Sequence, residues 1–365
     1  MTGAIKLFLC GDVMTGRGID QILPHPADPT LHEGYLHSAR DYVRLAEAAH
    51  GPIVRPVGPE YIWGDAVAEW EKAAPDLRIG NLETSVTRSV DWLDKGINYR
   101  MSPENAGCLS HARFDGCVLA NNHVLDFGRR GLLDTLDGLR SLRITTAGAG
   151  RDATEAAAPA VFEVPGKGRV LVFALAAESS GVPRDWAASR ARPGVNFVSL
   201  SDAAVHTLAG QISRVRRPGD VVVASIHWGA NWGYAVPEAQ SRFARSLIDQ
   251  ARVSIVYGHS SHHPKGLELH RGRLILYGCG DFINDYEGIG GYDEFRPDLS
   301  LMYFPELAPA SGELAALTMK PLRIRRLRLE RAPDEAAAWL AARLDGLSPG
   351  VRLAVDPRDG ALRLA

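Results

Sequence analysis

Short apolar segments alternate with amphipathic segments along most of the chain, and this alternation limits the possible fold more than any other feature. The apolar segments are rich in Val and Ile with Gly or Asp at their ends, as buried strands are: Ile5–Leu9, Leu77–Ile79, Cys117–Leu119, Val170–Leu175, Val221–Ile226, Val253–Tyr257 and Leu274–Tyr277. Helical spacing of apolar residues predicts helices over Arg129–Leu142, Ser201–Val215 and Pro237–Ala251. Such alternation indicates a layered α/β fold in which helices cover the sheets.

Two regions depart from this alternation. Residues 21–65 are rich in Pro, His and aromatic residues, which predicts an insertion near the carboxyl end of the first strand. Beyond about residue 305 the pattern predicts a strand over Leu317–Leu329, a helix over Asp334–Leu347 and a hairpin over Val351–Leu364. We therefore expect a catalytic domain over residues 1–305 and a small α+β extension over 306–365 that packs on it.

Composition excludes several classes of protein. Apolar residues make up 45% of the chain, charged residues 23%, and the net charge is −2, so neither nucleic acid nor an anionic membrane is expected as a partner. The N-terminus lacks the layout of a secretory signal, and no apolar stretch is long enough to span a bilayer. Four widely spaced cysteines without a CxxC pair indicate reduced thiols. We expect a cytoplasmic protein, and its oligomeric state is left open.

Turns rich in Gly, Asn or His follow nearly every predicted strand. They are Gly11-Asp12-Val-Met14, Gly80-Asn81-Leu-Glu83, Asn121-Asn122-His123-Val-Leu-Asp126, His227-Trp228-Gly229 and Gly258-His259-Ser-Ser-His262-His263. Each motif alone has a structural explanation, such as a turn or a core histidine. Because strand ends converge on one rim of an α/β sheet, five such turns favour a shared site. Carboxylate, amide and imidazole ligands without thiolate suit Mn, Zn, Fe, Mg or Ca.

The order of these motifs, closed by Tyr277-Gly-Cys-Gly-Asp281-Phe, resembles the CapA family from about residue 5 to residue 305. That family is named for poly-γ-glutamate capsule synthesis and has the calcineurin-like metallophosphatase fold. The resemblance implies a four-layer α/β/β/α sandwich with a metal site on its strand-end rim. It also implies a set of metal ligands, namely Asp12, Glu83 in the bridging position, Asn122, His227, His259 and His262. His123 takes the place of the general acid.

One departure from the two-metal phosphatase pattern concerns the second position after the first ligand. A histidine is usual there, whereas this chain has Met14, and a thioether is a poor ligand for a hard divalent ion. We therefore expect one strong metal position. Without a pair of ions roughly 4 Å apart, the clamp for phosphoryl displacement is weakened.

The remaining chemistry is acid–base catalysis beside a divalent ion, with Asp12, His123, His262 and His263 as candidate catalytic residues. Because the N-terminus carries no membrane anchor, the chain looks more like the branch of the family implicated in lasso-peptide tailoring than like the capsule enzymes. The favoured hypothesis is therefore L-to-D epimerisation at a peptide Cα. The alternatives, in order, are CapA-type hydrolysis or transpeptidation of poly-γ-glutamate amides, phosphoester hydrolysis, and a degenerate protein that binds a peptide or an ion without turnover.

Four residues are candidates for peptide binding. Arg17 can hold a substrate carboxylate or cap a local carbonyl, and Trp228, Trp232 and Tyr234 can line a groove or belong to the core. Two acids are expected to support the site from outside the ligand shell, Asp281 by orienting a ligand histidine and Asp126 by fixing its own turn. The insertion at 21–65 is where substrate selectivity is expected.

Overall fold

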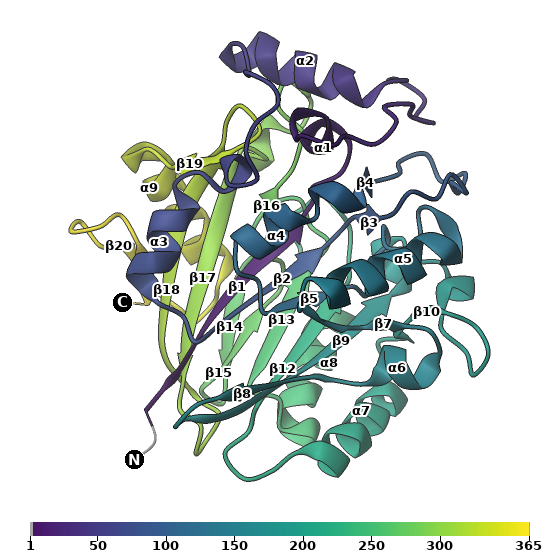
Figure 1. Ribbon diagram of the computed structural model, residues 1–365. Coiled ribbons are helices and arrows are strands. Elements are labelled where there is room, and N and C mark those ends of the chain that lie inside the picture. The colour runs from purple at the N-terminus through teal and green to yellow at the C-terminus, as the bar shows by residue number, and fades with distance from the viewer. Residues whose placement is uncertain (1–2, 365) are drawn as a thin grey trace.

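Two β-sheets lie face to face between layers of helices in the computed structural model, which describes residues 3–364 (Figure 1). The first sheet has ten strands in the order β20 (Leu353–Val355), β21 (Leu362–Leu364), β18 (Leu314–Ile324), β17 (Leu299–Leu307), β1 (Ile5–Val13), β2 (Leu77–Leu82), β5 (Gly116–Val118) and β6 (Thr145–Ala147), with β16 (Asp281–Ile283) beside β1 and β19 (Leu329–Arg331) beside β18. The second has seven strands in the order β11 (Phe197–Val198), β9 (Gly168–Ala177), β12 (Val221–His227), β13 (Ile255–His259), β15 (Arg273–Leu276) and β14 (Leu267–His270), with β8 (Ala160–Val164) beside β9.

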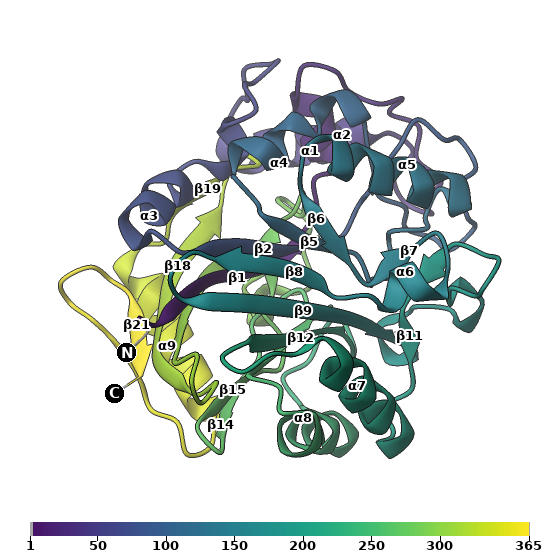
Figure 2. The same ribbon diagram turned by 60° about the horizontal axis from the view of Figure 1, so that its bottom comes forward.

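Helices cover both outer faces of this sandwich, as Figure 2 shows. On the side of the first sheet lie α1 (Arg17–Ile22), α2 (Ala39–His50), α3 (Ala66–Ala73), α4 (Gly107–His111) and α5 (Gly128–Ser141). On the side of the second sheet lie α7 (Asp202–Val215) and α8 (Glu238–Ala251), while α6 (Ala153–Ala157) and α9 (Asp334–Leu347) lie at the flanks. The α/β sandwich expected from the sequence is confirmed.

Burial on both faces explains why the central strands are apolar almost without interruption. Eight of the nine residues of β1 are buried, and all seven of β12 are buried. Strands covered on both faces are continuous apolar runs rather than alternating ones. One large core fills the space between the sheets and continues beneath the helices on the outer face of the first sheet. A second core lies between the second sheet and helices α7 and α8.

The C-terminal residues continue the first sheet instead of forming a separate layer. The expected boundary at 305/306 falls inside β17, which pairs with β1 on one side and with β18 on the other. The predicted strand over Leu317–Leu329 is divided by a turn into β18 and β19, and the hairpin of β20 and β21 extends the sheet edge. The helix predicted over Asp334–Leu347 is confirmed at both ends.

Strand register brings the predicted polar turns to one edge of the sandwich. Asp12 of β1 lies opposite Asn81 of β2 and Asp281 of β16, and His227 of β12 lies opposite His259 of β13. The insertion at 21–65, which contains α2, lies near this edge at the top of Figure 1. No helix within residues 3–364 combines the length and the apolar character needed to cross a lipid bilayer.

Candidate metal centre and active site

Asp12 lies fully buried at the centre of the site, where β1 ends. Its Oδ1 accepts a hydrogen bond from Asn81 Nδ2 at 2.8 Å, and its Oδ2 accepts one from the backbone N–H of Ser260 at 3.2 Å. The preceding residue must be a glycine, because a Cβ at Gly11 would lie 1.5 Å from the carbonyl oxygen of Gly280. This close approach of β1 and the loop before β16 brings Asp12 and Asp281 together.

One set of possible metal ligands combines Asp12 with two histidines from the second sheet. The ligand atoms of Asp12, His227 and His259 all lie within 4.8 Å of one another. His227 Nδ1 and His259 Nδ1 are 2.7 Å apart, so the two imidazoles converge on one point. The other nitrogen of His259 contacts Ser225 Oγ at 2.7 Å, an outer contact of the kind that orients a ligand histidine.

Two further predicted ligands flank this set from the side of the first sheet. Asn122 Oδ1 lies 3.0 Å from His227 Nε2, and Glu83 Oε1 lies 3.8 Å from the same nitrogen. Glu83 follows β2 and also accepts a hydrogen bond from Asn81 Nδ2 at 3.1 Å. Asn81 therefore bridges the carboxylates of Asp12 and Glu83.

A second set of possible ligands consists of Asp12, His262 and Asp281, also within 4.8 Å of one another. His262 Nδ1 lies 2.9 Å from Asp281 Oδ1, which matches the orienting contact expected for Asp281. The carboxylate of Asp281 is also close enough to Asp12 to serve as a ligand itself. The expectation of a single metal position rested on Met14, but the fold supplies Asp281 from β16 instead, so two donor sets share Asp12.

The charges in this cluster fit a divalent cation. Burial and the nearby charge of Asp281 raise the pKa of Asp12 to about 7, and burial together with Asp12 raises the pKa of Glu83 well above its usual range. Burial lowers the pKa of His227 strongly and that of His259 to about 3, so both imidazoles are neutral and can offer lone pairs. Burying ionised carboxylates beside neutral imidazoles costs free energy when no cation is present, and a bound cation offsets that cost.

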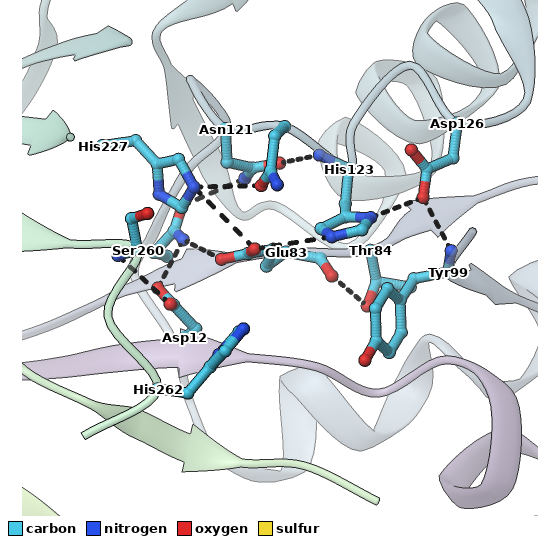
Figure 3. Close-up of polar contacts among 12 residues, drawn as sticks. Asp12, Glu83, Thr84, Tyr99, Asn121, His123, Asp126, His227, Ser260 and His262 are labelled. Atoms are coloured by element: carbon cyan, nitrogen blue, oxygen red, sulfur yellow. Dashed lines mark hydrogen bonds and ion pairs between the residues drawn. The ribbon is translucent and has the colours of Figure 1, made fainter. Parts of the chain in front are cut away.

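His123 belongs to neither donor set and lies between Glu83 and Asp126 (Figure 3). Its Nδ1 lies 2.6 Å from Asp126 Oδ2, and its Nε2 lies 3.8 Å from Glu83 Oε1. Burial lowers the pKa of His123 to about 4, against the opposing charge of Asp126. Because Asp126 accepts the proton on Nδ1, the lone pair of the neutral ring is on Nε2 and faces the metal cluster.

Lys95 is a site residue that no sequence motif indicated. Its Nζ donates to Asp126 Oδ1 at 2.7 Å and to the backbone carbonyl of Asn122, and it lies 3.3 Å from His123 Nδ1. Asp126 thus fixes more than its own turn, since it holds both His123 and Lys95. Lys95 lies in a loop without regular secondary structure, where neither periodicity nor a strand end marks a residue for attention.

Two cavities open beside the cluster and share His262, Tyr286, Asn231 and Ile97 in their walls. The larger, about 430 Å³, is lined by polar groups that include Lys95, Asn122 and His123. The smaller, about 140 Å³, has an aromatic wall that includes Tyr35 of the insertion, Tyr99, Trp232 and Tyr292. The ring of Trp232 lines this cavity and stacks on Tyr292 with 4.0 Å between centroids.

Several predicted residues lie elsewhere. The Trp228 side chain packs in the core against α8, and its indole N–H donates to the Tyr277 carbonyl, so it does not line a groove. His263 is fully buried, its ring stacked on Phe295 at 4.7 Å between centroids and set edge-on to Tyr234 at 4.6 Å. Neither His263 nor Tyr234 lines the two cavities, and the acid–base role expected for His263 has no access to substrate.

Arg17 is buried, and its guanidinium is already paired. It forms ion pairs with Asp285 at 2.5 Å and with Glu33 of the insertion at 2.9 Å, and it lies 3.9 and 4.1 Å from the ring centroids of Tyr42 and Tyr99. Arg17 thus anchors the insertion to the strand-end rim. Its edge contributes to the wall of the aromatic cavity, but the ion pairs leave it poorly suited to bind a substrate carboxylate.

Comparison with known proteins places this architecture in a family. Residues 6–286 match the family described as bacterial capsule synthesis protein PGA_cap. This chain belongs to that family. A Mycobacterium tuberculosis protein described as a probable polyglutamine synthesis accessory protein is 46% identical over 359 residues, which cover 97% of this chain and 94% of the relative.

More distant relatives carry the CapA name. The PGA biosynthesis protein CapA of Bacillus subtilis is 28% identical over 214 residues, 58% of this chain and 54% of the relative. The capsule biosynthesis protein CapA of Bacillus anthracis is 27% identical over 242 residues, 64% of this chain and 56% of the relative. The resemblance to CapA that the strand-end motifs indicated is therefore confirmed.

Proposed function

We propose that this CapA-family chain is an accessory enzyme of poly-glutamate or poly-glutamine synthesis that cleaves or transfers an amide bond of the polymer with the help of a divalent metal ion. The observation that carries the proposal is the position of His123 at the edge of the polar cavity, with Nδ1 held by Asp126 and Nε2 facing the Glu83 carboxylate. The descriptions of the relatives support the choice of polymer.

Asp12, Glu83, Asn122, His227 and His259 would hold the ion, and His262 with Asp281 would hold a second one beside it. When bound, such an ion polarises a carbonyl and lowers the pKa of a water molecule. The identity of the metal is not part of the proposal.

The residues of the chain supply the proton transfers. In hydrolysis the carbonyl carbon gains the oxygen of water, the C–N bond breaks, and the departing nitrogen takes up a proton. His123 Nε2 removes a proton from the attacking water and returns it to the departing nitrogen, while Asp126 holds the imidazole in the required tautomer and stabilises its charged form. With an amine in place of water, the same steps transfer the chain to a new acceptor.

None of these relatives' descriptions mentions epimerisation, the hypothesis favoured from the sequence. They name polyglutamine synthesis, PGA biosynthesis and capsule biosynthesis, which favours the CapA-type alternative. Phosphoester hydrolysis is a second candidate because of one observation. Two donor sets share Asp12, and a two-ion clamp is what phosphoryl displacement needs.

The experiment that tests the proposal incubates metal-reconstituted protein with defined glutamate and glutamine oligomers in ¹⁸O-labelled water, with and without an amine acceptor. Mass spectrometry of the products should show one ¹⁸O in each new carboxyl end, or a chain joined to the acceptor. The His123→Ala variant is the control. Intact oligomers with inverted Cα centres would support the epimerisation hypothesis instead. Turnover confined to phosphoesters would refute the amide proposal.

A further inference from the structure

Four arginines surround a single carboxylate on the hairpin that joins β18 to β19. Within residues 323–331 the sequence reads Arg-Ile-Arg-Arg-Leu-Arg-Leu-Glu-Arg. Ile324, Leu327 and Leu329 point into the core. The side chains of Arg323, Arg325, Arg326 and Arg328 stay 30–39% exposed. The four guanidinium groups nearest Glu330 belong to Arg323, Arg325, Arg326 and Arg328, at 3.2, 4.0, 3.5 and 4.0 Å from its oxygens.

This arrangement has more donors than its acceptor can use. Each guanidinium offers about five N–H donors, whereas a carboxylate accepts at about four lone-pair sites. The Nε atoms of Arg323, Arg326 and Arg328 are buried and have no hydrogen-bond partner within the described residues, so a bound carboxylate would have to reach the other guanidinium nitrogens. Only Arg323 reaches Glu330 at hydrogen-bonding distance. The hairpin therefore has unused capacity to bind further carboxylates.

A cavity of about 670 Å³ adjoins two of these arginines, between the hairpin and residues 52–67 of the insertion and its flank. Its walls are partly apolar, from Ile53, Val57 and Val67, and Arg326 and Arg328 form one side. The ring of Tyr61 lies beneath Arg328, and its hydroxyl donates to the Arg326 carbonyl at 2.9 Å. The wall also carries two acids, Glu60 and Asp65, and Asp65 accepts the backbone N–H of Arg331 at 2.8 Å.

The hairpin is connected to the active site through two adjacent residues. Tyr286 lines both cavities beside the metal cluster. Its neighbour Glu287 accepts the backbone N–H groups of Arg326 at 2.7 Å and Leu327 at 2.5 Å. The same carboxylate contacts His50 Nδ1 of α2 at 2.6 Å, so the insertion, the arginine hairpin and the site wall are joined.

We propose that the arginine hairpin and the adjoining cavity form a docking site for an acidic polypeptide, so that a poly-glutamate chain is held here while another part of it is processed at the metal centre. Guanidinium groups bind carboxylates in a bidentate manner, and the apolar wall suits the methylene groups of glutamate side chains. The identity of the polymer rests on the proposed function. The docking site itself rests on the charge complementarity.

The test measures binding by fluorescence anisotropy of labelled glutamate 20-mers, with glutamine 20-mers as the neutral probe. The protein is the full-length Asp12→Asn variant, in which turnover is suppressed, so that binding is read without catalysis. In that background the Arg326→Gln/Arg328→Gln pair should weaken glutamate binding roughly three- to thirtyfold, since exposed charge pairs contribute modestly one by one. The matched control pair is Arg352→Gln/Arg358→Gln, two more exposed arginines far from the hairpin in sequence.

The docking site would be supported if only the hairpin variant lost affinity, only for the glutamate probe, and if salt weakened glutamate binding to the unsubstituted hairpin. This result would stand even if the amide chemistry proved wrong. Equal affinity in the two arginine variants would overturn it. So would equal affinity for glutamate and glutamine, or tighter binding of a single-stranded DNA of the same charge. In the active protein, the hairpin variant should raise KM for long polymers and leave short oligomers unchanged.

Discussion

Replacing His123 by alanine separates the proton-transfer role from the metal-binding role. His123 Nδ1 is 2.6 Å from Asp126 and its Nε2 is 3.8 Å from Glu83, and the residue belongs to neither donor set. A positioned acid–base group contributes roughly 10²–10⁴-fold, which corresponds to about 3–5 kcal/mol of barrier. We therefore expect kcat on oligomers to fall by that factor while the metal content is unchanged.

The structure also sets the expected effect of this substitution on stability. Asp126 would keep the hydrogen bonds from Lys95 Nζ and from the Tyr99 backbone N–H, both at 2.7 Å, so its carboxylate stays paired. The loss in unfolding free energy should be about 1.5–3 kcal/mol, the worth of one hydrogen bond to a charged group. Chemical denaturation and elemental analysis of the purified variant measure the two quantities.

The matched control is His206→Ala, because His206 is exposed on α7, away from the site. Its turnover should equal that of the unmodified protein. If His123→Ala loses less than about threefold in kcat, or if it loses its metal, the assignment of His123 as the proton-transfer residue is refuted.

Four further predictions concern the metal, the core and His263. Asp12→Asn should remove metal from both donor sets, measured as the metal-to-protein ratio after dialysis, because both sets share this carboxylate. Chelation of the metal from the unmodified protein should lower its free energy of unfolding by about 2.7 kcal/mol when free metal had been at about 100 times its Kd, measured by denaturation with and without EDTA. Trp228→Ala should destabilise the protein by about 3–5 kcal/mol in denaturant titration, since its side chain is 2% exposed and packs in the second core. His263→Phe should retain kcat within a few-fold, because its ring stacks in an aromatic cluster, whereas an acid–base role would predict a loss of about 10²-fold or more.

The sequence predicted the central strands well because burial on both faces leaves a strong local signal. The apolar runs at Val170–Leu175 and Val221–Ile226 became β9 and β12, and the helix over Ser201–Val215 became α7 with Ser201 as its N-cap. Strand ends in a parallel sheet converge, so the turns that follow them could be assigned to one site from their order alone.

Contacts between distant segments could not be predicted in the same way. Nothing near Asp281 in the sequence shows that β16 will pair with β1 and supply a carboxylate beside Asp12. Lys95 reaches His123 from an irregular loop, and Trp228 follows a ligand histidine yet turns into the core, because successive residues of a strand point to opposite faces.

By itself, the sequence determined the α/β layering, the family, and the carboxylate, amide and imidazole groups that gather at the strand ends, because each depends on local pattern and chain order. Only the tertiary structure decided how many donor sets those groups form, which histidines line the cavities, and where the arginine hairpin lies relative to the site. The physical reason is that these features depend on strand register and side-chain direction between segments far apart in the chain, where no local periodicity carries the information.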